Sequence, residues 1–335
     1  MNLKQFFEAV RQMEQKLEVN LPPLALVTPE RMKEHLDQGL SLLPLVPPAL
    51  PVDQYLETLG RYRDLLLRFN PEVREDLEFQ AMALTGADPE VRGQLVRALL
   101  MADNGALFDL ASSLAIAPEQ LYFLGELALR PYLATYAELL ESVLDFEHYS
   151  GGHCPVCMRR PHMGRIDGEN HKYLHCQACE TSWRVPRIAC TACGCTETEK
   201  LGFFTVEGND ELRVEYCTDC GDYKKIINQR IRLRKLDFLV EDAATVHLDQ
   251  LAEQEGYVRG GRSPSSPATA GAAAAVDEPQ VCPTCYGTGQ VPGQEVCPEC
   301  LGLPESSVEG MTWVCDECGG TGRQKVSCPD CGGVH

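Results

Sequence analysis

The chain has 335 residues, enough for two or three domains at the usual size of roughly 100–200 residues each. Its formal net charge of −19 argues against nucleic-acid binding, because affinity for phosphate backbones comes mainly from lysine and arginine. A charged N-terminal stretch and the lack of a long apolar run argue against a secretory signal and a membrane span. We therefore expect a cytoplasmic protein with no membrane insertion.

Cysteine is the most informative residue type in this sequence. There are 17 cysteines, and all but one fall in C-x-x-C pairs. In a reducing compartment such pairs hold metal more often than they form disulfides, because the thiols remain available as thiolate ligands. The sequence therefore predicts a metal-binding protein.

Residues 1–148 contain no cysteine and show the apolar spacing of helices. Apolar residues recur at steps of three and four along 56–69, 91–99 and 133–144, which places them on one helix face. The stretch 43–51, LPLVPPALP, cannot form a regular helix because proline lacks the required N–H. We predict a helical domain whose apolar stripes form its core rather than a cofactor pocket.

Residues 149–228 hold nine cysteines, with β-prone runs at 201–206 and 212–216. Of the four C-x-x-C pairs here, 18 residues separate the first two and 23 separate the last two. Two such turns joined by a β-hairpin complete a tetrahedral four-sulfur shell with metal–sulfur bonds of about 2.3 Å. Sequential pairing puts one zinc or iron ion on Cys154, Cys157, Cys176 and Cys179, and a second on Cys190, Cys193, Cys217 and Cys220.

One interpretation is that these are structural metal sites that only stabilise the fold, since structural zinc contributes about 10–16 kcal/mol of folding free energy per site in finger peptides. A redox or iron role is the sharper alternative, because four-sulfur sites also suit iron. Cys195 lies outside the pairs and is either a buried bystander or a reactive or alternate ligand. His153 and His175 each precede a cysteine, and we interpret them as neighbours because each site already has four sulfurs.

Residues 236–255 return to a helical pattern, with expected inward positions at Phe238, Leu239, Ala243, Val246 and Leu251. A short basic run precedes them at Arg230, Arg232, Arg234 and Lys235. A zinc-ribbon protein that binds nucleic acid is one interpretation of this run. The acidic net charge favours the other, which is a solvated face.

An ordered set of motifs lies between Leu127 and Tyr257. The set comprises Leu-Arg-Pro at 129–131, GHCPVC at 152–157, YLHCQACETSW at 173–183, Arg187 with Cys190 and Cys193, EYCTDCGDYKK at 215–225, and DFLVEDAATVHLDQLAEQEGY at 237–257. In this order the motifs resemble the FdhE family of formate dehydrogenase accessory proteins. One departure follows the first cysteine pair, where Met158 and Arg159 replace the family's Gly-Ser. Because glycine accepts a positive φ without penalty, this exchange predicts a slightly distorted first turn.

The resemblance implies an accessory protein that contacts the catalytic subunit of formate dehydrogenase, which contains molybdenum or tungsten, during maturation. The sequence agrees, since we find no glycine-rich cofactor loop and no catalytic triad. We therefore predict no catalytic residues, no cofactor-binding residues and no enzyme activity. The alternative is a thiol–disulfide oxidoreductase or chaperone-like protein that uses its C-x-x-C pairs. Full metal occupancy favours the accessory protein, and metal-free reactive thiols favour the oxidoreductase.

Residues 259–280 are rich in Gly, Ser, Pro and Ala and predict a disordered linker. The segment 281–335 has few large apolar residues, so it needs metal to fold. Its four C-x-x-C repeats, with glycines after them, resemble the cysteine-rich zinc domain of DnaJ-type co-chaperones, although the chain lacks a His-Pro-Asp triplet. A metal-stapled tail without a partner is the alternative interpretation.

In that family the first and fourth repeats share one ion, and the second and third share another. The resemblance implies one ion on Cys282, Cys285, Cys328 and Cys331, and one on Cys297, Cys300, Cys315 and Cys318. The predicted fold class is helical plus small β, in five segments. These are a helical domain (1–148), tandem rubredoxin-like or zinc-ribbon knuckles (149–228), a helical extension of the FdhE-like region (229–258), the linker (259–280) and the DnaJ-type cysteine-rich metal module (281–335).

Overall fold

The computed structural model describes residues 2–24, 27–146, 148–206, 209–231 and 236–260, together with four strands between residues 290 and 327. Contacts between Cα atoms divide the chain into two units, Met1–Ser266 and Pro267–His335. Among the residues described, no helix combines the length and the apolar character needed to cross a membrane.

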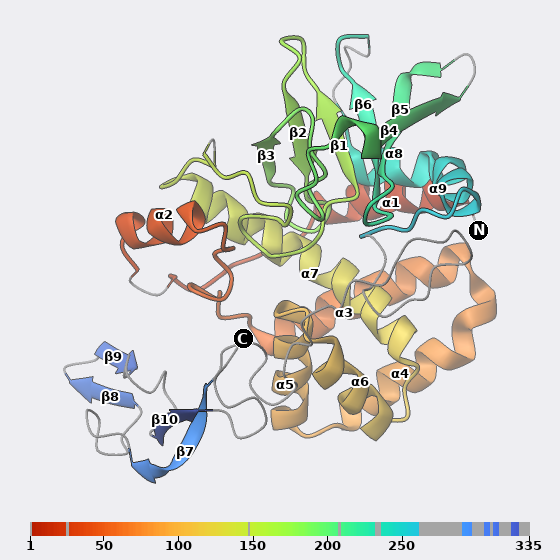
Figure 1. The fold of residues 1–335 in the computed structure, drawn as a ribbon. Helices are drawn as coiled ribbons and strands as arrows, with labels where there is room; N and C mark the ends of the chain where they lie inside the picture. The colour runs from red at the N-terminus through yellow and green to blue at the C-terminus, as the bar shows by residue number, and fades with distance from the viewer. Residues whose placement is uncertain are drawn as a thin grey trace. The chain divides into compact units, whose positions relative to one another are not determined.

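The first half of unit 1 is helical, as the apolar spacing predicts. Its helices are α1 (Leu3–Glu14), α2 (Pro29–Asp37), α3 (Val52–Phe69), α4 (Arg74–Gly86), α5 (Pro89–Leu100), α6 (Asn104–Ser113) and α7 (Pro118–Glu141), with a 3-10 turn at Pro71–Val73. The predicted stripe of α3 is buried at Leu59, Tyr62 and Leu66, and α3 packs against α7 (Figure 1). The proline-rich stretch 43–51 contains no helix, which confirms that prediction.

The second half of unit 1 forms one six-stranded sheet. Its strands are β1 (Met163–Ile166), β2 (Lys172–His175), β3 (Ser182–Val185), β4 (Leu201–Val206), β5 (Asn209–Cys217) and β6 (Tyr223–Asn228), in the order β3-β2-β1-β6-β5-β4. A 3-10 turn, Thr198–Lys200, precedes β4. Neighbouring strands are antiparallel except β1 and β6, which run parallel with Met163 opposite Lys225.

The sheet contains the two β-hairpins that the cysteine spacing predicts. The β1–β2 hairpin lies between the first two C-x-x-C pairs, and the β4–β5 hairpin lies between the last two. The parallel β1–β6 pairing joins both hairpins into one layer, and no pattern in the sequence predicts it. The two halves of this region therefore share one hydrogen-bonded sheet.

Two short helices follow the sheet and pack against it, and the first of them also packs against α1 (Figure 1). They are α8 (Phe238–Ala244) and α9 (Val246–Gln254). Phe238 is buried as predicted, but Val246 and Leu251 are each 39% exposed, so those two inward positions are wrong. The helix breaks at Thr245, which shifts the phase of the second part and turns Leu248 inward instead.

The helical half and the first cysteine hairpin share a single hydrophobic core. Cys154, Cys157, Cys176 and Cys179 belong to the same buried cluster as the apolar side chains of α1, α3, α5 and α7. A second, smaller cluster joins the sheet to α8 and α9 through Met163, Val214, Tyr223, Ile227 and Leu248. The first cysteine set is thus part of the helical core and not a separate appendage.

Unit 2 is described only by its four strands. They are β7 (Gln290–Val296), β8 (Glu305–Val308), β9 (Met311–Val314) and β10 (Arg323–Ser327). Strand β7 pairs antiparallel with β10, and β8 pairs antiparallel with β9. The predicted linker from residue 261 onward and the eight predicted ligands of this unit lie outside the described residues. Those ligands are Cys282, Cys285, Cys297, Cys300, Cys315, Cys318, Cys328 and Cys331.

Candidate metal centres

Each C-x-x-C pair of unit 1 forms the same tight turn. The N–H of the first cysteine donates to the carbonyl five residues later, and the N–H four residues later donates back to the carbonyl of that cysteine. In the first pair these bonds are Cys154 N to Arg159 O at 2.9 Å and Met158 N to Cys154 O at 3.1 Å. The pairs beginning at Cys176, Cys190 and Cys217 repeat both bonds at 2.8–2.9 Å. Such a turn holds two sulfurs on one side of a closed loop.

The fourth position after each first cysteine adopts the left-handed backbone conformation. Its φ is 65° at Met158, 66° at Glu180, 77° at Gly194 and 73° at Gly221. The distortion expected from Met158 is therefore absent, because this residue takes the same φ as glycine and makes the same hydrogen bond. The cost of roughly 1 kcal/mol for a side chain in this conformation is offset by the surrounding core.

The first four cysteines converge as the sequence predicts. Their sulfurs all lie within 4.8 Å of one another, with Cys154 Sγ 3.3 Å from Cys179 Sγ and Cys157 Sγ 3.4 Å from Cys176 Sγ. Four sulfurs around one ion stand about 3.8 Å apart, whereas disulfide sulfurs are bonded at about 2.05 Å. The donor set, its burial and its spacing therefore fit a tetrahedral metal ion.

The protonation of these thiols also bears on metal binding. Burial raises the pKa of the Cys154 and Cys179 thiols, while hydrogen bonds from the other three thiols lower the pKa of Cys176. An ion that enters must displace the remaining protons, which makes metal binding dependent on pH.

The second set converges in the same way but nearer the surface. Cys190 Sγ lies 3.6 Å from Cys220 Sγ, and Cys193 Sγ lies 3.8 Å from Cys217 Sγ. Cys193 is exposed and Cys220 is half-buried, whereas all four sulfurs of the first set are buried. The two sets can hold the same kind of ion, but chelators reach the second more easily.

The residues of uncertain role lie beside these sets and outside them. The main-chain oxygen of Cys195 closes the third turn, but its sulfur is not among the four that converge. The ring of His175 stacks on Phe238 at 4.1 Å, and its Nδ1 lies 2.9 Å from Ser182 Oγ. His153 faces the groove described below. Each of the three is a neighbour of the four-sulfur sets.

The non-helical stretch after α2 supports the first turn. The N–H groups of Leu42 and Leu43 donate to the carbonyls of Pro155 and Val156 at 2.7 and 2.9 Å. Ser41 Oγ adds a bond of 2.7 Å to the carbonyl of Cys154. This stretch thus connects the helical half to the main chain of the turn between Cys154 and Cys157.

A partly buried charged cluster ties the second turn to three helices. Arg130 of α7 donates to Glu14 of α1 at 2.9 Å and to Glu180 of the second turn at 3.2 Å. Arg11 also binds Glu14 and Glu180, and it reaches Asp237 at the start of α8 at 2.7 Å. Sequence reasoning singled out Arg130 within Leu-Arg-Pro, but it had no signal for these partners.

A groove of about 940 Å³ lies between α7 and the first two cysteine turns. Tyr122 and Phe123 of α7 line it and are 42% and 38% exposed. Met158, Gln177 and Ala178 of the cysteine turns form part of the opposite wall. The shape of this groove therefore depends on the turns that the first metal site would hold.

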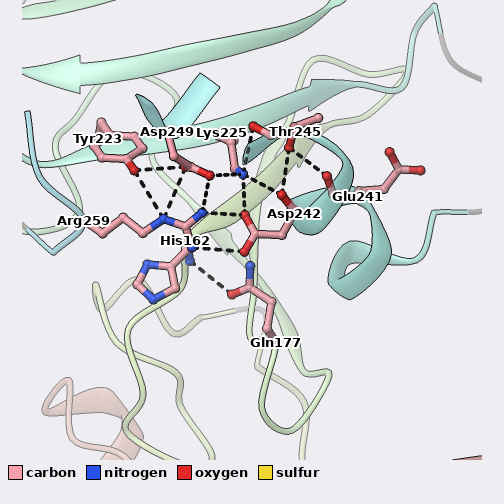
Figure 2. Close-up of polar contacts among 9 residues, drawn as sticks. All are labelled: His162, Gln177, Tyr223, Lys225, Glu241, Asp242, Thr245, Asp249 and Arg259. Carbon is pink, nitrogen blue, oxygen red and sulfur yellow. Dashed lines mark hydrogen bonds and ion pairs between the residues drawn. The ribbon is translucent and has the colours of Figure 1, made fainter. Parts of the chain in front are cut away.

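A second charged cluster fastens α8 and α9 to the sheet (Figure 2). Lys225 of β6 is fully buried, and its Nζ lies 2.6 Å from Asp242 and 2.7 Å from Asp249. Arg259 donates to Asp242 at 2.9 and 3.0 Å and pairs with Asp249 at 2.6 Å. Burial, with Arg259 adding, lowers the pKa of nearby His162 to about 4, so its ring is neutral near pH 7.

The chain end of unit 1 is held by the same region. Val258 N donates to Gly221 O at 2.9 Å, and Gly260 N donates to Asp222 Oδ1 at 2.8 Å. The described, hydrogen-bonded chain therefore extends two residues, 259 and 260, into the predicted linker. The pattern of charges at 222, 225, 242, 249 and 259 carries no periodic signal, so sequence reasoning could not pair them.

Two known protein domains match the region that contains both four-cysteine sets. The model of the FdhE central domain matches residues 153–187, and that of the FdhE C-terminal domain matches 188–265. The boundary between the two falls between the two four-cysteine sets. Each set therefore belongs to one of the two recognised domains.

Relatives that align with about three quarters of the chain agree with these matches. The FdhE homolog of Enterobacter sp. (strain 638) is 32% identical over 247 residues, covering 72% of this chain and 74% of the relative. Protein FdhE of Salmonella paratyphi A is 30% identical over the same share of both chains. The crystal structure of FdhE from Pseudomonas aeruginosa is 25% identical and superposes with a TM-score of 0.52, covering 77% of this chain and 90% of that one. The resemblance drawn from the motifs is confirmed, and the chain belongs to the FdhE family.

Proposed function

We propose that this protein assists the maturation of formate dehydrogenase by binding its catalytic subunit, and that its four-sulfur sites hold zinc or iron ions that shape the binding surface. Membership of the FdhE family supports an accessory role rather than catalysis. The observation that carries the proposal is the groove along α7, because residues of the first two cysteine turns form one of its walls. Exposed Tyr122 and Phe123 give it aromatic side chains of the kind enriched at protein interfaces.

In this arrangement the metal acts through structure. Cys154, Cys157, Cys176 and Cys179 would hold one ion, and Cys190, Cys193, Cys217 and Cys220 a second. Loss of one ligand releases the ion that closes two turns, so Gln177 and Ala178 lose their place in the groove wall. The first four cysteines are thus positioning residues for the binding surface.

The strands of unit 2 support the DnaJ-like pairing as a further part of the proposal. The β7–β10 register sets Gln290 opposite Ser327, and these residues follow the first repeat and precede the fourth in sequence. The β8–β9 register sets Glu305 opposite Val314, which likewise follow the second repeat and precede the third. Each register joins the strands that flank, in sequence, the two repeats proposed to share an ion.

The test is co-purification of the catalytic subunit with tagged protein from cells that make formate dehydrogenase. The double variant Cys176→Ala/Cys179→Ala should lose the subunit and lower formate dehydrogenase activity. Cys195→Ala is the matched control, since it removes a cysteine of the same region that lies outside both sets, and it should bind like the parent. If the double variant binds as well as the parent, the metal site does not shape the surface. If the parent retains no subunit, the proposed partner is wrong.

Metal analysis of the same samples separates this function from thiol–disulfide exchange. Metal bound in full, with cysteines that do not react with a thiol reagent, fits the accessory protein. Metal-free protein with fast-reacting thiols fits an oxidoreductase, because only a free thiolate is a nucleophile.

A further inference from the structure

A cavity of about 220 Å³ lies beside the second four-cysteine set. Charged side chains from β2, from the segment after β3 and from β5 line it, together with Cys190 and Cys217. Ile188 and Phe203 also line it and are each 60% exposed, so the cavity opens to solvent past two apolar side chains. None of the motifs that define the metal sites accounts for its charged lining.

Three cations of this cavity converge on a single carboxylate. Lys172 Nζ and Arg213 Nη2 both bind Glu215, and Arg187 Nη1 lies 3.5 Å from Glu215 Oε1. Lys224, which also lines the cavity, is balanced by Asp222 at 2.7 Å. Among the Lys, Arg, Asp and Glu side chains of the lining, four positive charges face two negative ones, in a chain whose net charge is −19.

These cations also have hydrogen-bond donors to spare. Within the described part of the chain, the Nε atoms of Arg187 and Arg213 are buried and have no hydrogen-bond partner. Lys172 is only 5% exposed and has three N–H donors, while Glu215 supplies one ion-pair acceptor. Buried donors without acceptors cost about 1–3 kcal/mol each, so an acceptor group in the cavity would be strongly favoured.

The charges around Arg187 also favour a bound anion. Burial, and after it the neighbouring Arg213, lowers the pKa of Arg187, and Glu215 only partly opposes this. Two guanidinium groups held close together with a single carboxylate between them form a site that gains from a further negative charge. Arg213 Cζ also lies 5.0 Å from the centroid of the Phe203 ring, a cation–π contact that favours this position of the guanidinium group.

We propose that this cavity binds an oxyanion, either a carboxylate or a phosphate, through Lys172, Arg187 and Arg213. The volume is below the 300–1,000 Å³ typical of pockets for drug-sized ligands, so it suits a small head group. Guanidinium forks match carboxylate and phosphate oxygens in pairs. The anion is either free in solution or carried by an acidic side chain of a partner protein, whose apolar part would rest on Ile188 and Phe203.

The competing explanation is that the cations balance the negative charge of four thiolates on a divalent ion. The three cations have Glu215 as their shared partner instead. Metal content is therefore included in the test, so that the two roles are distinguished.

The test uses the metal-loaded full chain and three variants. Thermal stability is followed as sodium phosphate, sodium acetate or a hexaglutamate peptide is added, with sodium chloride at equal ionic strength as reference. Arg187→Gln removes one guanidinium of the cavity, and Arg184→Gln removes an exposed arginine of β3 that does not line it. Arg187→Lys keeps the charge but not the fork.

We expect at least one probe to stabilise the parent and Arg184→Gln, with affinity about tenfold weaker in Arg187→Gln and intermediate in Arg187→Lys. A response to phosphate or acetate indicates a free anion, and a response to the peptide alone indicates a partner's carboxylate. The proposal is overturned if no probe acts, or if all variants respond equally. It is also overturned if Arg187→Gln loses metal while its affinity for the probes is unchanged. None of these anion-binding measurements depends on which protein is the maturation partner, so this proposal and the proposed function can fail independently.

Discussion

The main chain of Gly152 lies against the main-chain oxygen of Thr191, so that a Cβ atom at position 152 would stand 1.6 Å from that oxygen. Gly152 precedes the first cysteine turn, and Thr191 lies between Cys190 and Cys193 of the third. The two four-cysteine sets are therefore in direct contact through their loops. Only glycine permits this approach, because every other residue carries the Cβ atom.

Gly152→Ala should destabilise unit 1 by about 2 kcal/mol or more, since the atom that blocks the new Cβ is main chain and cannot rotate away. Chemical denaturation measures the change. Gly168→Ala in the β1–β2 hairpin is the control, because a Cβ atom there meets nothing within 4 Å. Equal stability of the two variants would show that the Gly152 loop adjusts freely.

Much of the site was predictable because its chemistry is local in sequence. A C-x-x-C pair determines its own turn, and two pairs with a hairpin between them determine which four sulfurs meet. The parallel β1–β6 pairing and the contact between Gly152 and Thr191 join segments that are far apart, and no spacing rule announces them. The same limit applies to Arg130 and Lys225, whose partners are set by tertiary packing alone.

The two wrong inward positions in 236–255 come from the rotational phase of the helix. A continuous helix over 236–255 would turn Val246 and Leu251 inward, and it would do so from the same apolar pattern that correctly predicts Phe238. Thr245 breaks the helix, and its hydroxyl donates to the carbonyl of Glu241 at 2.7 Å. A threonine within a helical pattern is a weak signal for a break, so the sequence alone could not place it.

The two metal sites of unit 1 should release their ions in two phases. The first set is buried in the helical core, whereas Cys193 of the second is exposed, so a chelator should empty the second set first. We expect four ions in the full chain and two in a chain ending at Ser266, purified without oxygen. Release from the shorter chain, followed with a colorimetric chelator, should lose its fast phase in Cys193→Ser. Loss of the fast phase in Cys176→Ser instead would reverse this order.

Glu14 should contribute to stability in a manner that depends on pH. Burial alone raises its pKa, but Arg130, Tyr62 and Arg11 outweigh burial and hold the pKa below its ordinary value of 4.5. A depressed pKa stabilises the fold above pH 4.5, and this contribution fades as the pH falls toward the pKa in the folded protein. Glu14→Gln should therefore cost about 3 kcal/mol near neutral pH, and less below pH 4.5.

The measurement is the free energy of unfolding of parent and variant at a series of pH values. The acid sensitivity of the metal sites is the same in both proteins, so it cancels in the difference between them. Glu8→Gln on the same helix is the control. Its carboxylate is 46% exposed and lies 3.9 Å from Lys4, so its loss should cost under about 1 kcal/mol at any pH. A Glu14→Gln effect that stays constant down to pH 3 would show that Glu14 acts through packing and not through its charge.

Truncation of the chain should be sharply sensitive to whether Arg259 is kept. A chain ending at Val258 loses the guanidinium that pairs with Asp242 and Asp249, which leaves buried Lys225 alone against two carboxylates. Removing one partner of a buried ion pair costs about 3 kcal/mol or more, because the remaining charge stays desolvated. We therefore expect the chain ending at Val258 to unfold α8 and α9 at lower denaturant than the chain ending at Ser266.

Arg259→Gln in the full chain should reproduce the loss without any truncation. Hydrogen exchange of the amides in 238–254 reports on these helices directly. Equal protection in the two truncated chains would show that Lys225 alone holds α8 and α9 to the sheet. Retention of the catalytic subunit should follow the same order, so a binding test that removes unit 2 must end at Ser266 and not at Val258.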